Sequence, residues 1–206
     1  MLIKVCGITN SEDALAAARL GADALGFVFS PSSRQISPGA AHKIIENLSL
    51  PVRTVGVFVD EDPERVASIA GLCDLDLLQF HGKETADYCG QFGRRVIKAI
   101  RIQNEDDLEA CAEYDTVAAA FLLDTYVAGQ SGGTGVTFDW KIAHTARKHG
   151  RIILAGGLNP DNVAVAIRMA EPYGVDASSG LEHKPGIKDH NKIARFIEAV
   201  RRAEKS

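Results

Sequence analysis

The chain has 206 residues, of which 46% are hydrophobic and 24% are charged, and its formal net charge is −4. This length and composition are typical of one globular domain, and the acidic balance argues against a general surface for nucleic acid or anionic membranes. No apolar run is long enough to span a membrane, and Lys4 interrupts the short apolar N-terminus, so we expect a cytoplasmic protein without a signal peptide. The four cysteines show no C-x-x-C spacing, which predicts neither a zinc site nor a disulfide framework.

Short β-branched runs alternate with helical patterns along the whole chain. We expect strands at 2–6, 24–29, 54–60, 75–80, 96–100, 119–124, 152–155 and 175–177. Helices are expected between them, at 11–20, 38–47, 63–70, 86–92, 105–112, 138–148, 162–170 and 190–202. Eight βα units in so short a chain predict an α/β fold, a single (βα)8 TIM barrel over residues 1–206. An open doubly wound sheet is the competing arrangement, but no topological break is visible.

Several local signals refine this prediction. Gly21 follows Arg19 at the end of the first helix and is expected to be its C-cap. Asn159 and Pro160 predict an N-cap with proline at the first helical position. The glycine-rich stretch 125–136 follows the sixth strand, and we interpret it as a hinged loop over the site, docked by residues 138–140.

Three ionisable side chains stand where strands end. Alternation gives Cys6, His81 and Asp124 the parity of the barrel lumen, at the rim where such barrels carry their chemistry. Each has an ordinary structural reading: a core thiol, a hydrogen-bonded loop histidine and a capping carboxylate. Their convergence favours a catalytic site, and the residues alone leave a covalent role for Cys6 open.

Two lysines lie inside strand patterns. Lys4 and Lys98 have a parity that can turn them into the lumen, where Asp124 and Asp176 are the available partners. A lysine charge below Cys6 is expected to lower the thiol pKa from about 8.5 toward neutrality.

The last two βα units indicate phosphate binding. Residues 155–160 contain Gly156 and Gly157 between a strand and a helix, and residues 177–180 contain Ser178 and Ser179 before another glycine. Backbone amides of such turns bind anions, and these two loops form the recurrent phosphate site of this fold. Arg34, in the loop after the second strand, can fork onto a substrate carboxylate, although a solvated loop arginine is the simpler reading.

These motifs closely resemble those of the phosphoribosylanthranilate isomerase family along nearly the whole chain. They are Lys4-Val-Cys-Gly-Ile-Thr9, Gly21-Ala-Asp-Ala-Leu-Gly-Phe-Val-Phe29, Ser33-Arg-Gln-Ile36, Val55-Gly-Val-Phe-Val59, Gln79-Phe-His-Gly82, Leu123-Asp-Thr125, Gly132-Gly-Thr-Gly135, Thr137-Phe-Asp-Trp140, Leu154-Ala-Gly-Gly-Leu-Asn-Pro160, Val175-Asp-Ala-Ser-Ser-Gly-Leu-Glu182 and Gly186-Ile-Lys-Asp189. Phe80 and Ala177 are mild departures from the family pattern and touch no reactive group.

The resemblance implies an Amadori rearrangement in tryptophan biosynthesis, without cofactor or metal. The substrate would be N-(5′-phosphoribosyl)anthranilate, and the protein a monomer or homodimer with no nucleic-acid or membrane partner. Asp124 would be the general acid that opens the furanose ring, Cys6 the general base at C2′, and Arg34 the ligand of the anthranilate carboxylate. The remaining substrate-binding residues would be His81, Gly156, Gly157, Asp176, Ser178 and Ser179, with the two glycines and two serines around the phosphate.

Two alternatives stay open. An isomerase of histidine biosynthesis would share the phosphate loops, but that family has a carboxylate where Cys6 stands. A binding protein that has lost catalysis would not need both Cys6 and Asp124.

Overall fold

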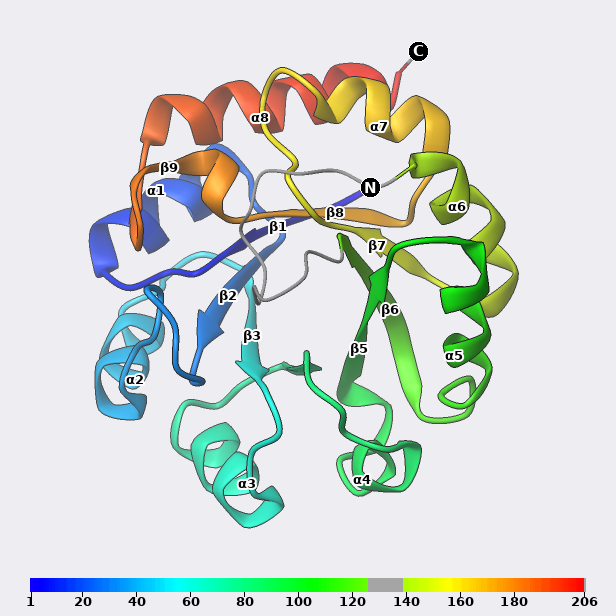
Figure 1. The fold of residues 1–206 in the computed structure, drawn as a ribbon. Coiled ribbons are helices and arrows are strands. Elements are labelled where there is room, and N and C mark those ends of the chain that lie inside the picture. The colour runs from blue at the N-terminus through cyan, green and yellow to red at the C-terminus, as the bar shows by residue number, and fades with distance from the viewer. Residues whose placement is uncertain (126–138, 206) are drawn as a thin grey trace.

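The computed structural model describes residues 1–125 and 139–205, and its strands form a closed barrel. Eight parallel strands pair in chain order, and the eighth pairs back to the first (Figure 1). The strands are β1 (Leu2–Cys6), β2 (Ala24–Val28), β3 (Arg53–Phe58), β4 (Leu77–Phe80), β5 (Val96–Ile102), β6 (Ala118–Thr125), β7 (Ile152–Leu154) and β8 (Gly174–Ala177). The predicted (βα)8 barrel is confirmed.

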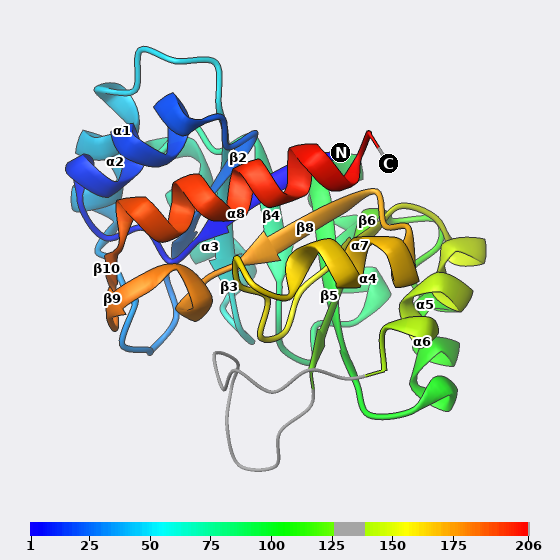
Figure 2. The same cartoon turned by 90° about the horizontal axis from the view of Figure 1, so that it is seen from above.

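The helices lie outside this barrel, as Figure 1 shows, and α7 packs along α8 on one side (Figure 2). They are α1 (Ser11–Leu20), α2 (Pro38–Glu46), α3 (Pro63–Leu72), α4 (Ala86–Gly90), α5 (Glu109–Ala112), α6 (Trp140–Thr145), α7 (Val163–Ala170) and α8 (His190–Ala203). Short 3-10 turns occupy Gly93–Arg95, Glu105–Leu108, Ala146–His149 and Ser179–Leu181, and an antiparallel hairpin of β9 (Glu182–Lys184) and β10 (Ile187–Lys188) precedes α8.

Two helix ends test the capping predictions. Gly21 caps α1 in the left-handed conformation with φ 105°, which confirms that prediction. The N-cap predicted at Asn159 is wrong, because α7 begins at Val163 and Asn162 is its N-cap. The Asn159 side chain instead accepts hydrogen bonds from the backbone amides of Asp161 and Asn162 (2.9 and 3.2 Å), closing a turn before the helix.

Small and branched side chains fill the barrel lumen. Val55, Ile97, Ala99, Leu122 and Ile153 are among the buried residues of this inner cluster, which is separate from the larger core between strands and helices. Strands of a parallel barrel are buried on both faces, so alternation sends each side chain to one core or the other.

The side chains of the two strand lysines therefore lie on opposite faces of the barrel wall. Lys4 turns inward as predicted and forms an ion pair with Asp176 (Nζ–Oδ1 2.8 Å). The inward orientation predicted for Lys98 is wrong: its neighbours Ile97 and Ala99 face the lumen, and Lys98 points the other way to pair with Glu84 (Nζ–Oε2 2.8 Å). Its position over the Tyr114 ring, 5.5 Å from the ring centre, places it in the outer layer.

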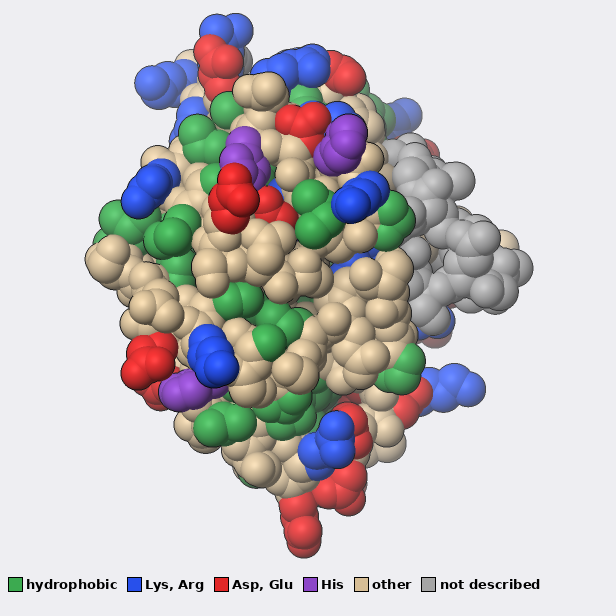
Figure 3. All heavy atoms as spheres, turned by 90° about the vertical axis from the view of Figure 1, so that its left-hand side faces the viewer, with side chains coloured by type: hydrophobic (Ala, Val, Ile, Leu, Met, Phe, Trp, Pro, Cys, Tyr) green, Lys and Arg blue, Asp and Glu red, His purple; other side chains and the backbone are tan. Residues whose placement is uncertain are grey.

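On the outer surface around β9, α1 and α2, basic and acidic side chains are interspersed in the part that the structure describes (Figure 3). Within residues 1–125 and 139–205, no helix is long and apolar enough to cross a membrane. Nearly all of the predicted covering loop, 126–136, lies outside the described residues. The assignment of residues 1–206 to one domain stays a prediction.

Candidate active site

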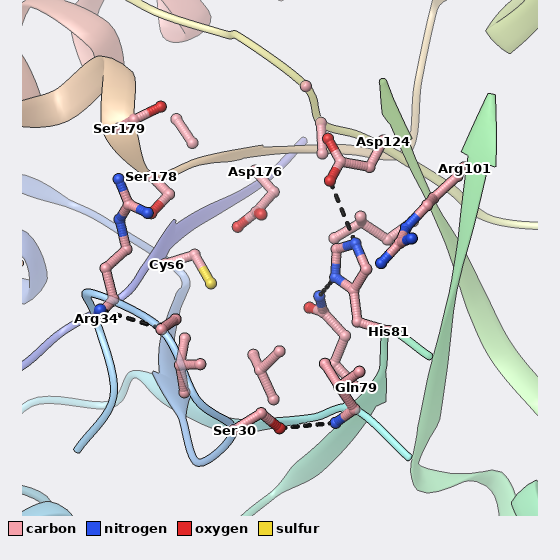
Figure 4. A pocket seen from close by; sticks show the side chains of 18 of the residues that line it. Cys6, Ser30, Arg34, Gln79, His81, Arg101, Asp124, Asp176, Ser178 and Ser179 are labelled. Carbon is pink, nitrogen blue, oxygen red and sulfur yellow. Dashed lines mark hydrogen bonds and ion pairs between the residues drawn. The ribbon is translucent and has the colours of Figure 1, made fainter. Parts of the chain in front are cut away.

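One pocket opens at the carboxyl ends of the strands and brings the predicted residues together. Its lining includes all nine of them: Cys6, Arg34, His81, Asp124, Gly156, Gly157, Asp176, Ser178 and Ser179. In Figure 4, Cys6 and Asp124 occupy separate sides of this pocket, and Asp176 lies between them in this view. Cys6, Asp124 and Asp176 lie on β1, β6 and β8, and the other positions follow β2, β4, β7 and β8, so the closed barrel makes them neighbours.

The thiol of Cys6 lies at the end of β1 beside a permanent positive charge. Burial disfavours the charge of Lys4, but Asp176 and Cys6 beside it raise the lysine pKa overall. For Cys6, burial raises the pKa above its ordinary value, while Lys4 acts in the opposite direction. The expected net lowering of the thiol pKa is therefore wrong: desolvation outweighs the lysine, which only limits the rise.

Gly26 on β2 makes room for this pair. A Cβ atom there would lie 2.7 Å from the Cys6 sulfur and 3.1 Å from the Lys4 ammonium nitrogen. Both distances are shorter than ordinary van der Waals contact. Glycine at this position therefore lets the thiol and the ammonium group approach each other from neighbouring residues of one strand face.

The carboxylate of Asp124 is held by a chain of hydrogen bonds. His81 Nε2 lies 3.2 Å from Asp124 Oδ2, and Gln79 Nε2 lies 3.1 Å from His81 Nδ1 (Figure 4). An amide NH2 group can only donate, so His81 Nδ1 accepts and its proton resides on Nε2, facing Asp124. The second carboxylate oxygen accepts from the Thr125 amide at 2.9 Å. Asp124 is thus fixed in orientation with both oxygens as acceptors.

The loops after β7 and β8, which contain the predicted glycines and serines, also line the pocket. Gly156 and Gly157 have φ values of 81° and 68°, which favour glycine. A Cβ atom on Gly156 would lie 2.6 Å from the Thr125 backbone nitrogen, so this loop lies directly against the end of β6. The buried Ser178 hydroxyl has no hydrogen-bond partner among the described residues, although buried hydroxyls ordinarily have one.

Arg34 reaches the pocket already paired. Its Nε and Nη2 atoms donate to Glu182 Oε1 and Oε2, both at 2.8 Å, in a bidentate ion pair. The hydrogen bonds to Glu182 raise the pKa of Arg34. Burial alone would raise the pKa of Glu182, but Arg34 and Lys188 lower it overall.

Arg101 and Glu182 are two of the charged residues at the pocket that were not predicted as site residues. Arg101 lines the pocket from β5, which runs to Ile102 rather than ending at 100. A longer predicted strand would have indicated Arg101 as a candidate at the strand end. Glu182 belongs to the short hairpin after β8; it ends one of the family motifs, but that motif gave it no role at the pocket. No group of three His, Cys, Asp or Glu side chains within 1–125 and 139–205 is arranged to hold a metal ion.

The closed barrel, with ionisable side chains in a pocket at the carboxyl ends of the strands, defines the class of protein: a (βα)8-barrel enzyme. Comparison with known proteins narrows the class. The family model for N-(5′-phosphoribosyl)anthranilate (PRA) isomerase matches residues 3–199.

Individual relatives point to the same family as the family model. The chain is 50% identical over 196 residues to N-(5′-phosphoribosyl)anthranilate isomerase of Geobacter sp. (strain M21), covering 95% of each chain. The phosphoribosyl anthranilate isomerase structure from Thermotoga maritima is 43% identical with a TM-score of 0.91, covering 98% of both chains. A structure of such an isomerase in complex with reduced 1-(o-carboxyphenylamino)-1-deoxyribulose 5-phosphate is 41% identical with a TM-score of 0.87, again over 98% of both chains. The chain belongs to the N-(5′-phosphoribosyl)anthranilate isomerase family, whose members are aldose–ketose isomerases.

Proposed function

We propose that this protein converts N-(5′-phosphoribosyl)anthranilate into 1-(2-carboxyphenylamino)-1-deoxyribulose 5-phosphate in tryptophan biosynthesis, with Asp124 as general acid and Cys6 as general base. Membership of the family supports the overall reaction. The observation that carries the proposed roles is the presence of Cys6 and Asp124 in one pocket with the glycine and serine loops after β7 and β8. A monomer or homodimer acting on a phosphorylated small molecule is part of the same proposal.

The reaction needs an acid and a base at different atoms of one sugar. Asp124 gives a proton to the furanose ring oxygen, the C1′–O bond breaks, and the nitrogen lone pair forms an iminium ion. Cys6 thiolate then removes the C2′ proton, and the electron pair of that bond neutralises the iminium to give an enolamine. Tautomerisation of the enolamine gives the ketone. A side chain at each end of the pocket fits this sequence of proton transfers.

Asp124 has to carry a proton when it acts as the general acid. Both of its oxygens accept hydrogen bonds, from His81 and from the Thr125 amide, which fixes the orientation of the carboxyl group in the pocket. In this proposal His81 orients the acid rather than the sugar, which refines its predicted role in substrate binding.

The remaining substrate groups have matching partners. The phosphate fits the loops that contain Gly156, Gly157, Ser178 and Ser179, where an unpaired buried hydroxyl is available. The anthranilate carboxylate fits the free edge of Arg34. Asp176 supports Lys4 by its ion pair, and Lys4 stabilises the Cys6 thiolate against desolvation.

The test is to incubate the purified protein with N-(5′-phosphoribosyl)anthranilate and follow loss of substrate. Cys6→Ser and Asp124→Asn should each lower kcat by at least about 100-fold, because each removes a proton-transfer group. Cys73→Ser is the matched control, since the Cys73 thiol donates to the Pro38 carbonyl (3.4 Å) outside the pocket and a hydroxyl can do the same. Absence of turnover by the unaltered protein, or undiminished turnover by both variants, would contradict the proposal.

A further inference from the structure

Glu182 lies between two cations at the edge of the pocket. One carboxylate binds Arg34 through both oxygens at 2.8 Å and also accepts from Lys188 Nζ at 3.0 Å. The Gly186 amide donates to the same oxygen as Lys188, at 3.3 Å. Glu182 and Lys188 are buried, so bulk water does not compete for these contacts.

The hairpin that carries Glu182 is tied to the start of the chain. The backbone amide of Lys188 donates to Asp13 Oδ2 on α1 at 2.8 Å. Thr9, in the loop after β1, donates its hydroxyl to the Gly186 carbonyl. The Lys188 ammonium group also donates to the Ser178 carbonyl at 3.2 Å, next to the proposed phosphate loop. These contacts fix the Glu182 carboxylate relative to β1 and β8.

Arg34 follows a defined path to reach Glu182. A Cβ atom on Gly7 would lie 2.7 Å from Arg34 Cδ and 3.0 Å from the Ser178 hydroxyl oxygen, so the arginine stem crosses directly over this glycine. Gly7 has a φ of 78°, which a larger residue would adopt only with strain. Figure 4 shows the guanidinium group beside Ser178, on the same side of the pocket as Cys6.

The ion pair uses only one edge of the guanidinium group. Nε and Nη2 face Glu182, which leaves the N–H groups of Nη1 and the second N–H of Nη2 on the other edge. That edge has the fork geometry that matches a second carboxylate. The formal charges of Arg34, Lys188 and Glu182 sum to +1, so pairing with Glu182 does not abolish attraction for an anion.

We propose that Glu182 is a positioning residue that holds Arg34 so that its free edge faces the aryl carboxylate of the substrate, and that this pair sets the preference for carboxylated aryl amines. The proposal rests on the function proposed above. An arginine already fixed by Glu182 loses little further side-chain freedom on binding, which favours a carboxylate-bearing ligand. A ligand with phenyl in place of 2-carboxyphenyl gains nothing from this arrangement.

The test compares two ligands in Glu182→Gln, which keeps the shape of the side chain and removes its charge. The ligands are reduced 1-(2-carboxyphenylamino)-1-deoxyribulose 5-phosphate and its phenylamino counterpart, used as inhibitors. We expect the inhibition constant of the carboxyphenylamino ligand and the KM of the substrate each to rise about tenfold. The inhibition constant of the phenylamino ligand should change less than about twofold, and kcat less than about threefold. Glu171→Gln, which breaks the exposed pair with Arg147 away from the pocket, is the matched control and should change none of these values.

A second variant separates positioning from a general structural effect. In an Arg34→Lys background, which cannot form the fork, Glu182→Gln should change the first inhibition constant less than about twofold. Equal weakening of both ligands in Glu182→Gln, or no weakening of either, overturns the inference while leaving the proposed function intact. Failure of the unaltered protein to turn over N-(5′-phosphoribosyl)anthranilate overturns both.

Discussion

Two buried lysines of this barrel make similar ion pairs in different places. Lys4 binds Asp176 and Lys98 binds Glu84, both at 2.8 Å, and both lysines are almost completely buried. Lys4 faces the lumen beneath Cys6, whereas Lys98 faces the outer layer, where it also donates to the Gly82 carbonyl at 2.8 Å. Burial and pairing alone therefore do not identify a functional lysine; the face of the strand does.

The outer pair organises backbone. Glu84 accepts from the amides of Asp60 and Gly82 at 2.8 and 2.9 Å, and Tyr114 donates its hydroxyl to the Glu84 carbonyl at 2.9 Å. Glu84 therefore joins the loops after β3 and β4 to the helical layer. The inner pair makes a different kind of contact, since its partner Asp176 and the neighbouring Cys6 line the pocket. We expect substitutions to separate these roles into activity and stability.

The largest effect is expected from Lys4→Met. Without the ammonium group the Cys6 thiolate loses its stabilising charge, so kcat should fall about 100-fold. The same loss raises the Cys6 pKa further, because the charged form of a thiol is the anion. The rise of kcat/KM with pH that reports the base should therefore move to higher pH. A pH–rate profile measures the shift, and an unmoved profile would contradict the role of Lys4.

A smaller loss is expected from Gly26→Ala. The added Cβ would displace the Cys6 sulfur and the Lys4 nitrogen from their present separation, and we expect kcat to fall about tenfold. Gly39→Ala in α2 is the matched control, because a Cβ there meets nothing within 4 Å. This control should retain full activity and gain about 0.5 to 1 kcal/mol in stability from the better helix propensity of alanine. Equal kcat values for the two variants would show that the close approach at Gly26 has no catalytic consequence.

The smallest effect on activity is expected from Lys98→Met. This change leaves the buried Glu84 carboxylate without its cation and should lower the free energy of unfolding by about 3 kcal/mol. Because Lys98 does not face the Cys6 thiol, kcat should stay within about threefold of the unaltered protein. Urea denaturation and steady-state kinetics on one preparation test both values. A large loss of kcat with unchanged stability would reverse the comparison.

The difference between these lysines also shows how far sequence reasoning reaches. Alternating apolar runs and helical patterns were sufficient to predict the closed barrel, and strand ends pointed to Cys6, His81 and Asp124 in the pocket, whereas the other predicted residues came from loop patterns and from the family resemblance. The face of Lys98 was mispredicted because a shift of one residue reverses the face of every side chain in a strand, and the apolar neighbours of Lys98 in residues 96–100 do not indicate which face is inward.

Contacts between distant segments could not be predicted from the sequence, for another reason. Arg34 and Glu182 are 148 positions apart, and nothing local in the hairpin after β8 marks Glu182 as the partner of Arg34. The net effect on the Cys6 pKa depends on how deeply the thiol is buried, which the strand pattern does not give. Both became visible only once the closed barrel placed β1, β2 and β8 next to one another.

We assign opening of the furanose ring to Asp124 and removal of the C2′ proton to Cys6. The most direct measurement is the kinetic isotope effect on turnover of substrate deuterated at C2′, compared between Cys6→Ser and Asp124→Asn. Slower proton abstraction in Cys6→Ser should make the C–H bond cleavage rate-limiting and give a large isotope effect. Slower ring opening in Asp124→Asn should give a value near one. The reverse order, or equal isotope effects in the two variants, would contradict the assignment of acid and base.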